Sequence, residues 1–465
     1  MMVVFLLAVA SIGRIAAGSQ KPAVRQIPGP ILVPGAVAAM NTPGYWIGRH
    51  PDPDRVVMTG VEIAAFNKRI READETVVDI GGLPETMDGD KLKADLAACL
   101  SQVKSRGYYL ASGRRPDDAW WQSMETNMDL DAIGPQVSVR FGLVTGFCDH
   151  RVLPTTEGLY RENLDLNFDR LQDSTLDVGA PVAVLHKTRD GRWLYAVGET
   201  MRGWVETDSV ALCGRDVVTR LISSEKFAVV TAAKADLFGD ERLRTYLGRA
   251  QMGTRLAVAR DTADASALAV LVPGRNQDGS CTLNTAHIQR TDASLGYLPY
   301  TPRTILNQAF KLLHTPYGWG GMFGEQDCSR FVQEVFATVG LVLPRNSSEQ
   351  GKVGRVAYAN AQAGSADRKR AALRDRAVPA LTLLHMNGHV MLFLGFVDDR
   401  PYIVHDLWGY SVDRSTMAVV NRVAVTPADL GGGTSGTLLD HVDAIRVLDV
   451  HNGSRRDSED ARHGE

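Results

Sequence analysis

The sequence predicts a multidomain protein in which a mainly helical region and two small β-barrels precede an α+β domain. Apolar residues recur at helical spacing up to about residue 135 and alternate with polar residues from Val137 onward. After residue 300 the chain contains both helical and strand-like runs, as an α+β domain requires. A chain of 465 residues, 44% of them hydrophobic, is long enough for about three domains with cores of their own.

The N-terminal segment has an apolar core followed by small residues. We predict a secretory signal peptide over residues 1–18, with a buried strand as the alternative, and an extended proline-rich tether over 19–36. No other stretch is long and apolar enough to cross a bilayer, so the chain is expected to be exported, periplasmic or extracellular, with no membrane span. The charged tail at 451–465 is predicted to be disordered.

Residues 37–135 are predicted to form a mainly helical stabilising region that packs against the other domains. Thr59 and Glu62 make a capping-box pattern ahead of an apolar helical face. Leu92, Leu96 and Leu100 mark a second amphipathic helix by their spacing.

The alternating stretch is predicted to form two barrels, one over residues 136–214 and a weaker, divergent copy over 215–300. In the first, Val182 and Val184 alternate with polar residues, and a tight turn precedes Trp193 and Tyr195. The stretches 190–197 and 203–205 resemble bacterial SH3-like domains.

A cysteine in the C-terminal part stands where a nucleophile would be expected. The turn-forming stretch Pro316–Gly321 is followed by Asp327–Phe331 and an apolar run at helical spacing, so Cys328 is predicted to lie in the first turn of a helix. A helix N-terminus stabilises a thiolate, and its N–H groups can donate to an oxyanion. The alternative is a small buried hydrophobic residue.

Two strand-like runs offer histidines as partners for this cysteine. His389 opens the run Gly388–Gly395, and His405 closes the next run, Pro401–His405. One imidazole would activate the thiol and the other would orient the first, as in a nucleophile–base–orienter arrangement. Each histidine could instead be a surface or capped residue, and His385 is a rival for His389.

Five segments together resemble the NlpC-type family of bacterial cell-wall cysteine peptidases, in order and spacing: Pro316–Gly321, Asp327–Phe331, Leu343–Ser347, Gly388–Gly395 and Tyr402–Trp408. The resemblance implies a papain-like catalytic domain over residues 301–450. It makes Cys328 the nucleophile, His389 the base and His405 the orienting third member. It also implies substrate-binding roles for the residues around them, namely Tyr317, Asp327, Ser329 and Ser347. Arg330 departs from the pattern, because the family commonly has a glycine there.

The family resemblance further implies a peptidoglycan hydrolase. Its expected reaction is cleavage of the γ-D-glutamyl bond to meso-diaminopimelate or lysine in stem peptides or muropeptides, with a free N-terminal L-Ala, through a thioester and without a cofactor. In resembling peptidases the first barrel walls the active site. The segment from Leu153 to Thr175 is therefore either a solvated loop or a lid whose acidic residue pairs with the substrate ammonium. The rival functions are a thiol amidase or acyltransferase on another small amide, and a non-catalytic cell-wall binding protein.

Charge and cysteine content restrict the partners. A formal net charge of −3 with no basic stripe argues against nucleic acid, and no residue spacing indicates a metal site. A monomer is expected. If Cys328 stays reduced for catalysis, the other four cysteines could form two disulfides, with Cys148–Cys213 the first pair to test, or could remain thiols.

Overall fold

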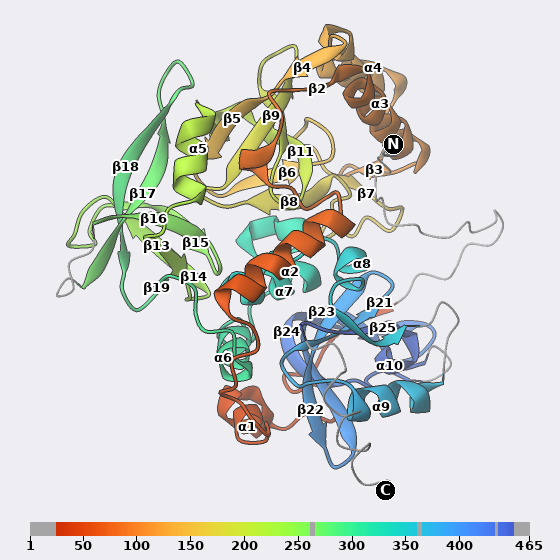
Figure 1. Cartoon of the computed structure of the whole chain (residues 1–465). Coiled ribbons are helices and arrows are strands. Elements are labelled where there is room, and N and C mark those ends of the chain that lie inside the picture. The colour runs from red at the N-terminus through yellow and green to blue at the C-terminus, as the bar shows by residue number, and fades with distance from the viewer. Residues whose placement is uncertain (1–24, 261–265, 360–364, 433–435, 451–465) are drawn as a thin grey trace, which may run out of the picture. The chain divides into compact units, whose positions relative to one another are not determined.

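The computed structural model describes residues 25–260, 266–359, 365–432 and 436–450, and these fold into two compact units (Figure 1). Unit 1 comprises residues 71–298 and 316–338, and unit 2 comprises residues 25–70, 299–315 and 339–450. The predicted signal peptide and the predicted disordered tail lie outside the described residues. Within these residues, no helix combines the length and the apolar composition needed to span a bilayer.

The first sheet of unit 1 has seven strands in the order β12-β5-β9-β10-β11-β6-β8. Its strands are β5 (Arg140–Val144), β6 (Cys148–Arg151), β8 (Gln172–Leu176), β9 (Pro181–Lys187), β10 (Trp193–Val197), β11 (Arg202–Glu206) and β12 (Val210–Cys213). Every residue of β10 is buried, because its two faces pack into different hydrophobic clusters. Trp193 and Tyr195 join the larger cluster and Leu194 the smaller one.

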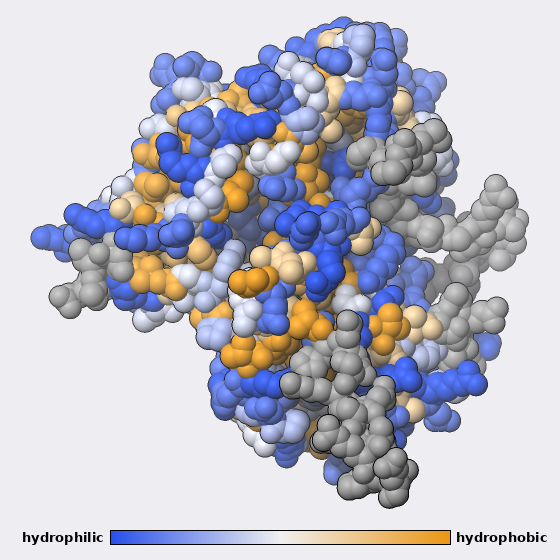
Figure 2. Space-filling model, in the orientation of Figure 1, coloured by the Kyte–Doolittle hydropathy of each residue, from blue (hydrophilic) through white to orange (hydrophobic). Residues whose placement is uncertain are grey.

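The helices α3 (Gly89–Ser105) and α4 (Asp118–Met128) contribute to the larger cluster. Leu92, Leu96 and Leu100 are buried there, as their spacing predicted. Hydrophilic residues predominate on the outer side of these helices (Figure 2). Smaller elements accompany them: η2 (Ile80–Gly82), η3 (Leu130–Ala132), η4 (Thr207–Ser209), and the two-stranded pairs β2 (Thr86–Asp88) with β4 (Gln136–Ser138) and β3 (Tyr109–Leu110) with β7 (Leu159–Tyr160).

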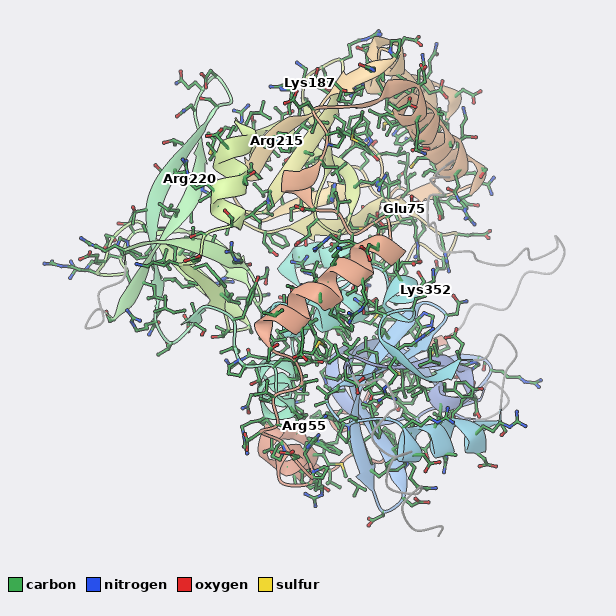
Figure 3. All side chains as sticks on the ribbon, in the orientation of Figure 1. Arg55, Glu75, Lys187, Arg215, Arg220 and Lys352 are labelled. Carbon is green, nitrogen blue, oxygen red and sulfur yellow. The ribbon has the colours of Figure 1, made fainter. Side chains whose placement is uncertain are left out.

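The second sheet of unit 1 has seven strands in the order β15-β14-β18-β17-β16-β13-β19. Its strands are β13 (Phe227–Val230), β14 (Lys234–Phe238), β15 (Tyr246–Gln251), β16 (Arg255–Arg260), β17 (Ala267–Arg275), β18 (Cys281–Gln289) and β19 (Ala293–Leu295). Helix α5 (Arg215–Ile222) joins the two sheets and buries Val218. Its Arg220 is exposed, and its Arg215 guanidinium lies 4.7 Å from the Phe141 ring centroid (Figure 3).

Unit 2 is built on one sheet with the strand order β1-β24-β23-β22-β21-β25-β20. Its strands are β1 (Arg25–Pro28), β20 (Arg355–Ala359), β21 (Thr382–Met386), β22 (His389–Val397), β23 (Arg400–Ser411), β24 (Thr416–Pro427) and β25 (Val442–Val447). Its helices are η1 (Ala38–Asn41), α1 (Pro43–Ile47), α2 (Gly60–Ala73, of which residues 60–70 belong to this unit), α6 (Pro302–Lys311), α8 (Ser347–Gln350), α9 (Ala366–Asp375) and α10 (Leu438–His441). The predicted capping box is present, since the Thr59 N–H donates to Glu62 Oε2 at 2.7 Å and the Glu62 N–H to Thr59 Oγ1 at 3.4 Å.

Three predicted boundaries differ from the structure. Within the predicted tether, residues 25–28 form the edge strand β1, which pairs in parallel with β24 because an edge tolerates proline. Residues 37–70 of the predicted helical region belong to unit 2, whereas α3 and α4 of the same predicted region belong to unit 1. Residues 316–338 group with the two sheets of unit 1, because this stretch contacts both of them.

Candidate active site

The predicted nucleophile lies at the start of α7 (Cys328–Ala337), in unit 1. Asp327 is the N-cap residue, and its Oδ1 accepts from the Arg330 N–H at 2.9 Å and from Ser329 Oγ at 3.0 Å. The helix therefore begins where the sequence predicted, because a capping carboxylate precedes an apolar run. Cys328 is 5% exposed, and its thiol lies in the first turn, near the positive end of the helix dipole.

A glycine turn, η5 (Trp319–Gly324), precedes this helix and requires its glycines. Gly320 and Gly321 have φ values of 58° and 89°. A Cβ on Gly320 would lie 2.6 Å from Gln172 O, and one on Gly321 would lie 2.5 Å from Thr175 Cγ2. The Gly320 N–H donates to Asp327 Oδ2 at 3.1 Å, and Gly320 O accepts from Gln172 Nε2 at 3.1 Å. The turn is thus bonded both to the N-cap residue and to β8 of the first sheet.

Arg330 anchors α7 to the first sheet. Its guanidinium pairs with Asp177, which follows β8, and its Nε donates to Glu334 Oε1 at 2.9 Å. Burial and the charge of Asp177 raise the pKa of Glu334 to about 7 against the opposing effect of Arg330, since two carboxylates share one guanidinium. The departure from the family pattern at this position therefore adds a buried ion-pair cluster.

The segment from Leu153 to Thr175 is mostly irregular and is exposed at residues 156–157, 161–163 and 166–167, but other parts of it pack into unit 1, so it is a partly buried loop rather than a fully solvated one. Leu153, Leu159 and Leu171 are fully buried. Asp169 forms a buried ion pair with Arg151 at 2.8 Å. The segment contains the whole of β7 and all but the last residue of β8, and a run of local polarity does not reveal such pairing.

Aromatic side chains connect this segment with the glycine turn. The Phe168 ring centroid lies 6.1 Å from that of Tyr317 and 5.3 Å from that of Trp319. The Arg170 guanidinium stacks over the Trp319 ring at 4.7 Å. Tyr317 is therefore half-buried beside the first sheet.

The two predicted histidines bond to each other in unit 2. His389 is the first residue of β22, and its Nε2 lies 2.7 Å from His405 Nδ1. His405 lies within the twelve-residue strand β23 rather than at its end, and its Nε2 lies 3.0 Å from Thr426 Oγ1 on β24. Burial, and then the charge of His389, hold the pKa of His405 well below its ordinary value. His405 is therefore neutral and has one ring N–H to donate.

These two hydrogen bonds decide the tautomer of His405. When His389 is an imidazolium, its Nε2 carries a proton and donates it to His405 Nδ1. His405 then carries its own proton on Nε2, which donates to Thr426 Oγ1. Sequence reasoning missed Thr426, because it lies in an apolar run and becomes a neighbour of His405 only through strand pairing.

The rival His385 has a different partner. Its Nδ1 lies 2.6 Å from Asp443 Oδ1, and a Cβ on Gly351 would lie 2.6 Å from its Cγ. It is packed between β25 and the residue that follows α8. Ser347, the first residue of α8, is half-buried in the same unit. The structure therefore groups Tyr317, Asp327, Cys328 and Ser329 in unit 1, and Ser347, His389 and His405 in unit 2.

The cysteines have partners other than the pair that was named first for testing. None of the five, all of which lie in the described residues, is in a disulfide. Burial raises the pKa of Cys148 to about 12, and its thiol bonds to Ser209 and to the backbone of Leu176. Cys213 bonds to Cys281 rather than to Cys148, the partner named first for testing.

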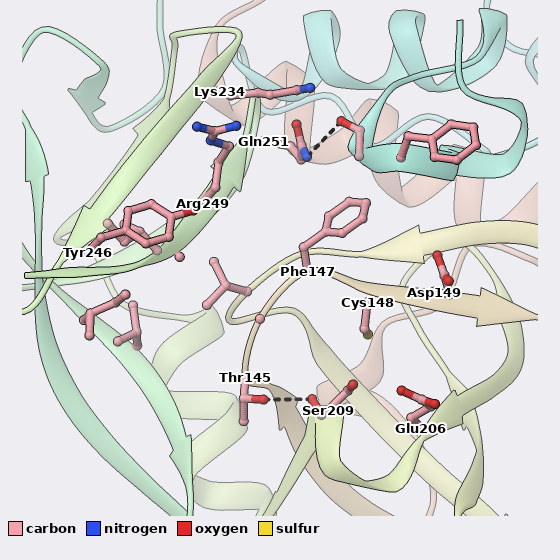
Figure 4. A pocket seen from close by; sticks show the side chains of 18 of the residues that line it. Thr145, Phe147, Cys148, Asp149, Glu206, Ser209, Lys234, Tyr246, Arg249 and Gln251 are labelled. Carbon is pink, nitrogen blue, oxygen red and sulfur yellow. Dashed lines mark hydrogen bonds between the residues drawn. The ribbon is translucent and has the colours of Figure 1, made fainter. Parts of the chain in front are cut away.

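A pocket of about 770 Å³ lies elsewhere in unit 1, between the two sheets (Figure 4). Ion pairs and hydrogen bonds already hold its polar walls: Lys234 pairs with Glu325 at 2.6 Å, and Gln251 Nε2 donates to Gly324 O at 3.3 Å. Phe147 and Tyr246 contribute aromatic surface. None of the predicted site residues lines this pocket.

Comparison with known domain families identifies two parts of the chain. Residues 314–416 match the model of the NlpC/P60 family, and residues 159–206 match an SH3 domain of the SH3b1 type. The chain thus contains an NlpC/P60 domain C-terminal to an SH3b domain, which confirms the resemblance found in the sequence.

Solved structures extend the comparison. An NlpC/P60 endopeptidase from Photobacterium damselae subsp. piscicida is similar at 19% identity with a TM-score of 0.72, over 90% of this chain and 98% of that one, which shows a shared fold. An NlpC/P60 family protein from Bacillus cereus ATCC 10987 is 17% identical over 60% of this chain and 82% of that one. Its TM-score of 0.43 is too low to carry an argument. No curated protein matches the chain in sequence.

Proposed function

We propose that this protein is an exported cysteine endopeptidase that hydrolyses peptidoglycan stem peptides at the γ-D-glutamyl bond to the diamino acid. The observation that carries the proposal is the bonded pair His389–His405, which lies inside the segment 314–416 that matches the NlpC/P60 family and is extended by Thr426 beyond that segment. A cysteine in the first turn of α7 supplies the matching nucleophile.

In the proposed mechanism, Cys328 Sγ attacks the γ-carbonyl carbon of D-glutamate. His389 takes the thiol proton at Nδ1, because its Nε2 bonds to His405. The backbone N–H groups at the start of α7 stabilise the oxyanion. The tetrahedral intermediate collapses to a thioester, and His389 returns the proton to the departing amine of the diamino acid.

Hydrolysis of the thioester completes the cycle. His389 removes a proton from water, the hydroxide oxygen attacks the acyl carbon, and the Cys328 thiol is regenerated. His405 stays neutral throughout and accepts the Nε2–H of the His389 imidazolium, which stabilises that charged state and fixes its ring orientation.

Substrate recognition is proposed to involve Tyr317, Asp327, Ser329 and Ser347, with Asp327 and Ser347 lining the pocket that receives the free amino group of L-Ala. The Phe168–Tyr317 contact supports a role for the SH3b domain in shaping the site. A stem peptide without a free amino group would then be a poor substrate.

The test is incubation of the full chain with L-Ala-γ-D-Glu-meso-diaminopimelate, followed by mass spectrometry. We expect release of the diamino acid by the wild type and none by Cys328→Ala. The L-lysine analogue identifies the preferred diamino acid, and the N-acetylated peptide tests the need for a free amine. A folded, reduced wild type that releases nothing would exclude this reaction and favour another amide or a binding role.

A further inference from the structure

The two sheets of unit 1 meet at a pair of cysteines. Cys213 is the last residue of β12 in the first sheet, and Cys281 is the first residue of β18 in the second. Both are half-buried, and their thiols are hydrogen-bonded to each other. Neither belongs to the proposed active site.

The backbone brings these two residues into register. Leu212 and Ser280, the preceding residues, form a parallel β-bridge, and the Leu212 N–H donates to Gly279 O at 2.9 Å. In a parallel bridge, the residues that follow the paired residues are also neighbours. The Cα atoms of Cys213 and Cys281 are therefore expected to lie at the usual strand spacing of about 4.8 Å. This spacing lies within the Cα separation of about 4.4–6.8 Å that a disulfide spans.

We infer that Cys213 and Cys281 form a disulfide that cross-links the two sheets once the chain meets an oxidising thiol–disulfide environment. The oxidant is an external disulfide. One Cys thiolate attacks it and releases one external thiol, and the second Cys thiolate attacks the resulting mixed disulfide and releases the other. One S–S bond forms, the external S–S bond is reduced to two thiols, and the two cysteine protons pass to those thiols.

Burial and the hydrogen bond between the two thiols indicate which cysteine attacks the external disulfide first. Burial raises the pKa of Cys213 to about 12. Burial also raises the pKa of Cys281, but hydrogen bonding from Cys213 lowers it in part. Cys281 is therefore the thiol that attacks the external disulfide, and Cys213 resolves the mixed disulfide.

The cross-link would stabilise unit 1 by restricting its unfolded chain. The loop that it closes runs from residue 213 to residue 281 and contains α5 and the strands β13 to β17. Closing a loop of this length is expected to raise the unfolding temperature by about 5–10 °C. The inference does not depend on the proposed peptidase activity.

The experiment compares the full chain after treatment with oxidised glutathione and after treatment with dithiothreitol. A Cys328→Ser background keeps the proposed nucleophile out of the chemistry. Remaining thiols are alkylated, and the unreduced digest is analysed by mass spectrometry. We expect one cross-linked peptide that contains Cys213 and Cys281 and is absent after reduction, with Cys99 and Cys148 alkylated on denaturation.

Thermal unfolding is the second measurement. The oxidised chain should unfold about 5–10 °C above the reduced chain, and Cys213→Ala/Cys281→Ala should remove this redox dependence. Alkylation of both cysteines in the oxidised sample, separate glutathione adducts on each, or a Cys148–Cys213 peptide would overturn the inference. The comparison of oxidised with reduced samples needs no substitution at Cys213 or Cys281, and repeating it with the wild-type chain ensures that a misfolded variant cannot decide the outcome.

Discussion

The hydroxyl of Thr426 gives the sharpest test of the proposed histidine chain. Replacing it in Thr426→Val keeps the side-chain shape but removes the acceptor 3.0 Å from His405 Nε2. Both residues are completely buried, so water cannot replace the acceptor. His405 is then driven toward the tautomer that carries its proton on Nδ1, which donates to His389 Nε2 and leaves the His389 proton on Nδ1. That form cannot accept the thiol proton.

The expected fall in kcat follows from the loss of the hydrogen bond between His405 and Thr426. Leaving a buried donor without a partner costs about 1–3 kcal/mol. If most of this cost is expressed in the chemical step, kcat falls roughly 10- to 100-fold, because each 1.36 kcal/mol is a factor of ten. KM should change little, since the proposed mechanism gives Thr426 no contact with substrate.

The assay is steady-state hydrolysis of the tripeptide by wild type, Thr426→Val and Thr426→Ser, with thermal unfolding of each. The serine variant keeps the hydroxyl and should recover most of the activity. The rate of alkylation of Cys328 against pH is a further readout, because loss of the imidazolium partner raises the thiol pKa. A destabilised valine variant with wild-type kcat and an unchanged alkylation profile would refute the positioning role.

Three further changes test other parts of the structure. Gly321→Ala should destabilise the chain by about 2–4 kcal/mol in denaturant unfolding, since it combines a φ of 89° with a close approach to Thr175, and an unchanged midpoint would contradict the assigned turn. The pKa of Glu334 is raised to about 7 on folding, so the folded state holds this proton more tightly than the unfolded state. The free energy of unfolding should therefore decline by up to about 3 kcal/mol as pH rises from 4.5 through 7. Glu334→Gln should flatten that part of the plot of unfolding free energy against pH. His385→Gln should keep kcat/KM within about fivefold of wild type, whereas His389→Gln should lose at least about 100-fold, and the reverse order would make His385 the base.

Short stretches of the sequence were sufficient to predict some elements of this structure. The turn-forming stretch Pro316–Gly321 and the apolar run that begins at Phe331 predicted the start of α7, and the pair Thr59 and Glu62 predicted the cap of α2. Each depends on residues three or four positions apart, whose preferences are set by helix geometry. The strand that begins at His389 was also predicted locally, from a strand-like run bounded by Gly388 and Gly395.

The features that were missed depend on residues far apart in the chain. Thr426 reaches His405 through strand pairing, and Cys281 reaches Cys213 through a bridge between two sheets. Their own neighbourhoods in the sequence are an apolar run and a polar turn, which indicate no such partners. The anchoring of Arg330 to Asp177 was missed for the same reason, although its departure from the family pattern was visible.

The edge strand β1 affects how the chain can fold during synthesis. Arg25 pairs with Thr416, and the Tyr402 hydroxyl donates to Gly35 O, so the sheet of unit 2 joins segments that are far apart in the sequence. Ribosomal synthesis delivers β24 long after β1, and contacts of such high sequence separation form slowly. Unit 2 can complete its sheet only after β24 and β25 have emerged. A fragment limited to residues 301–450 would expose the β24 edge, where a second chain could add a strand.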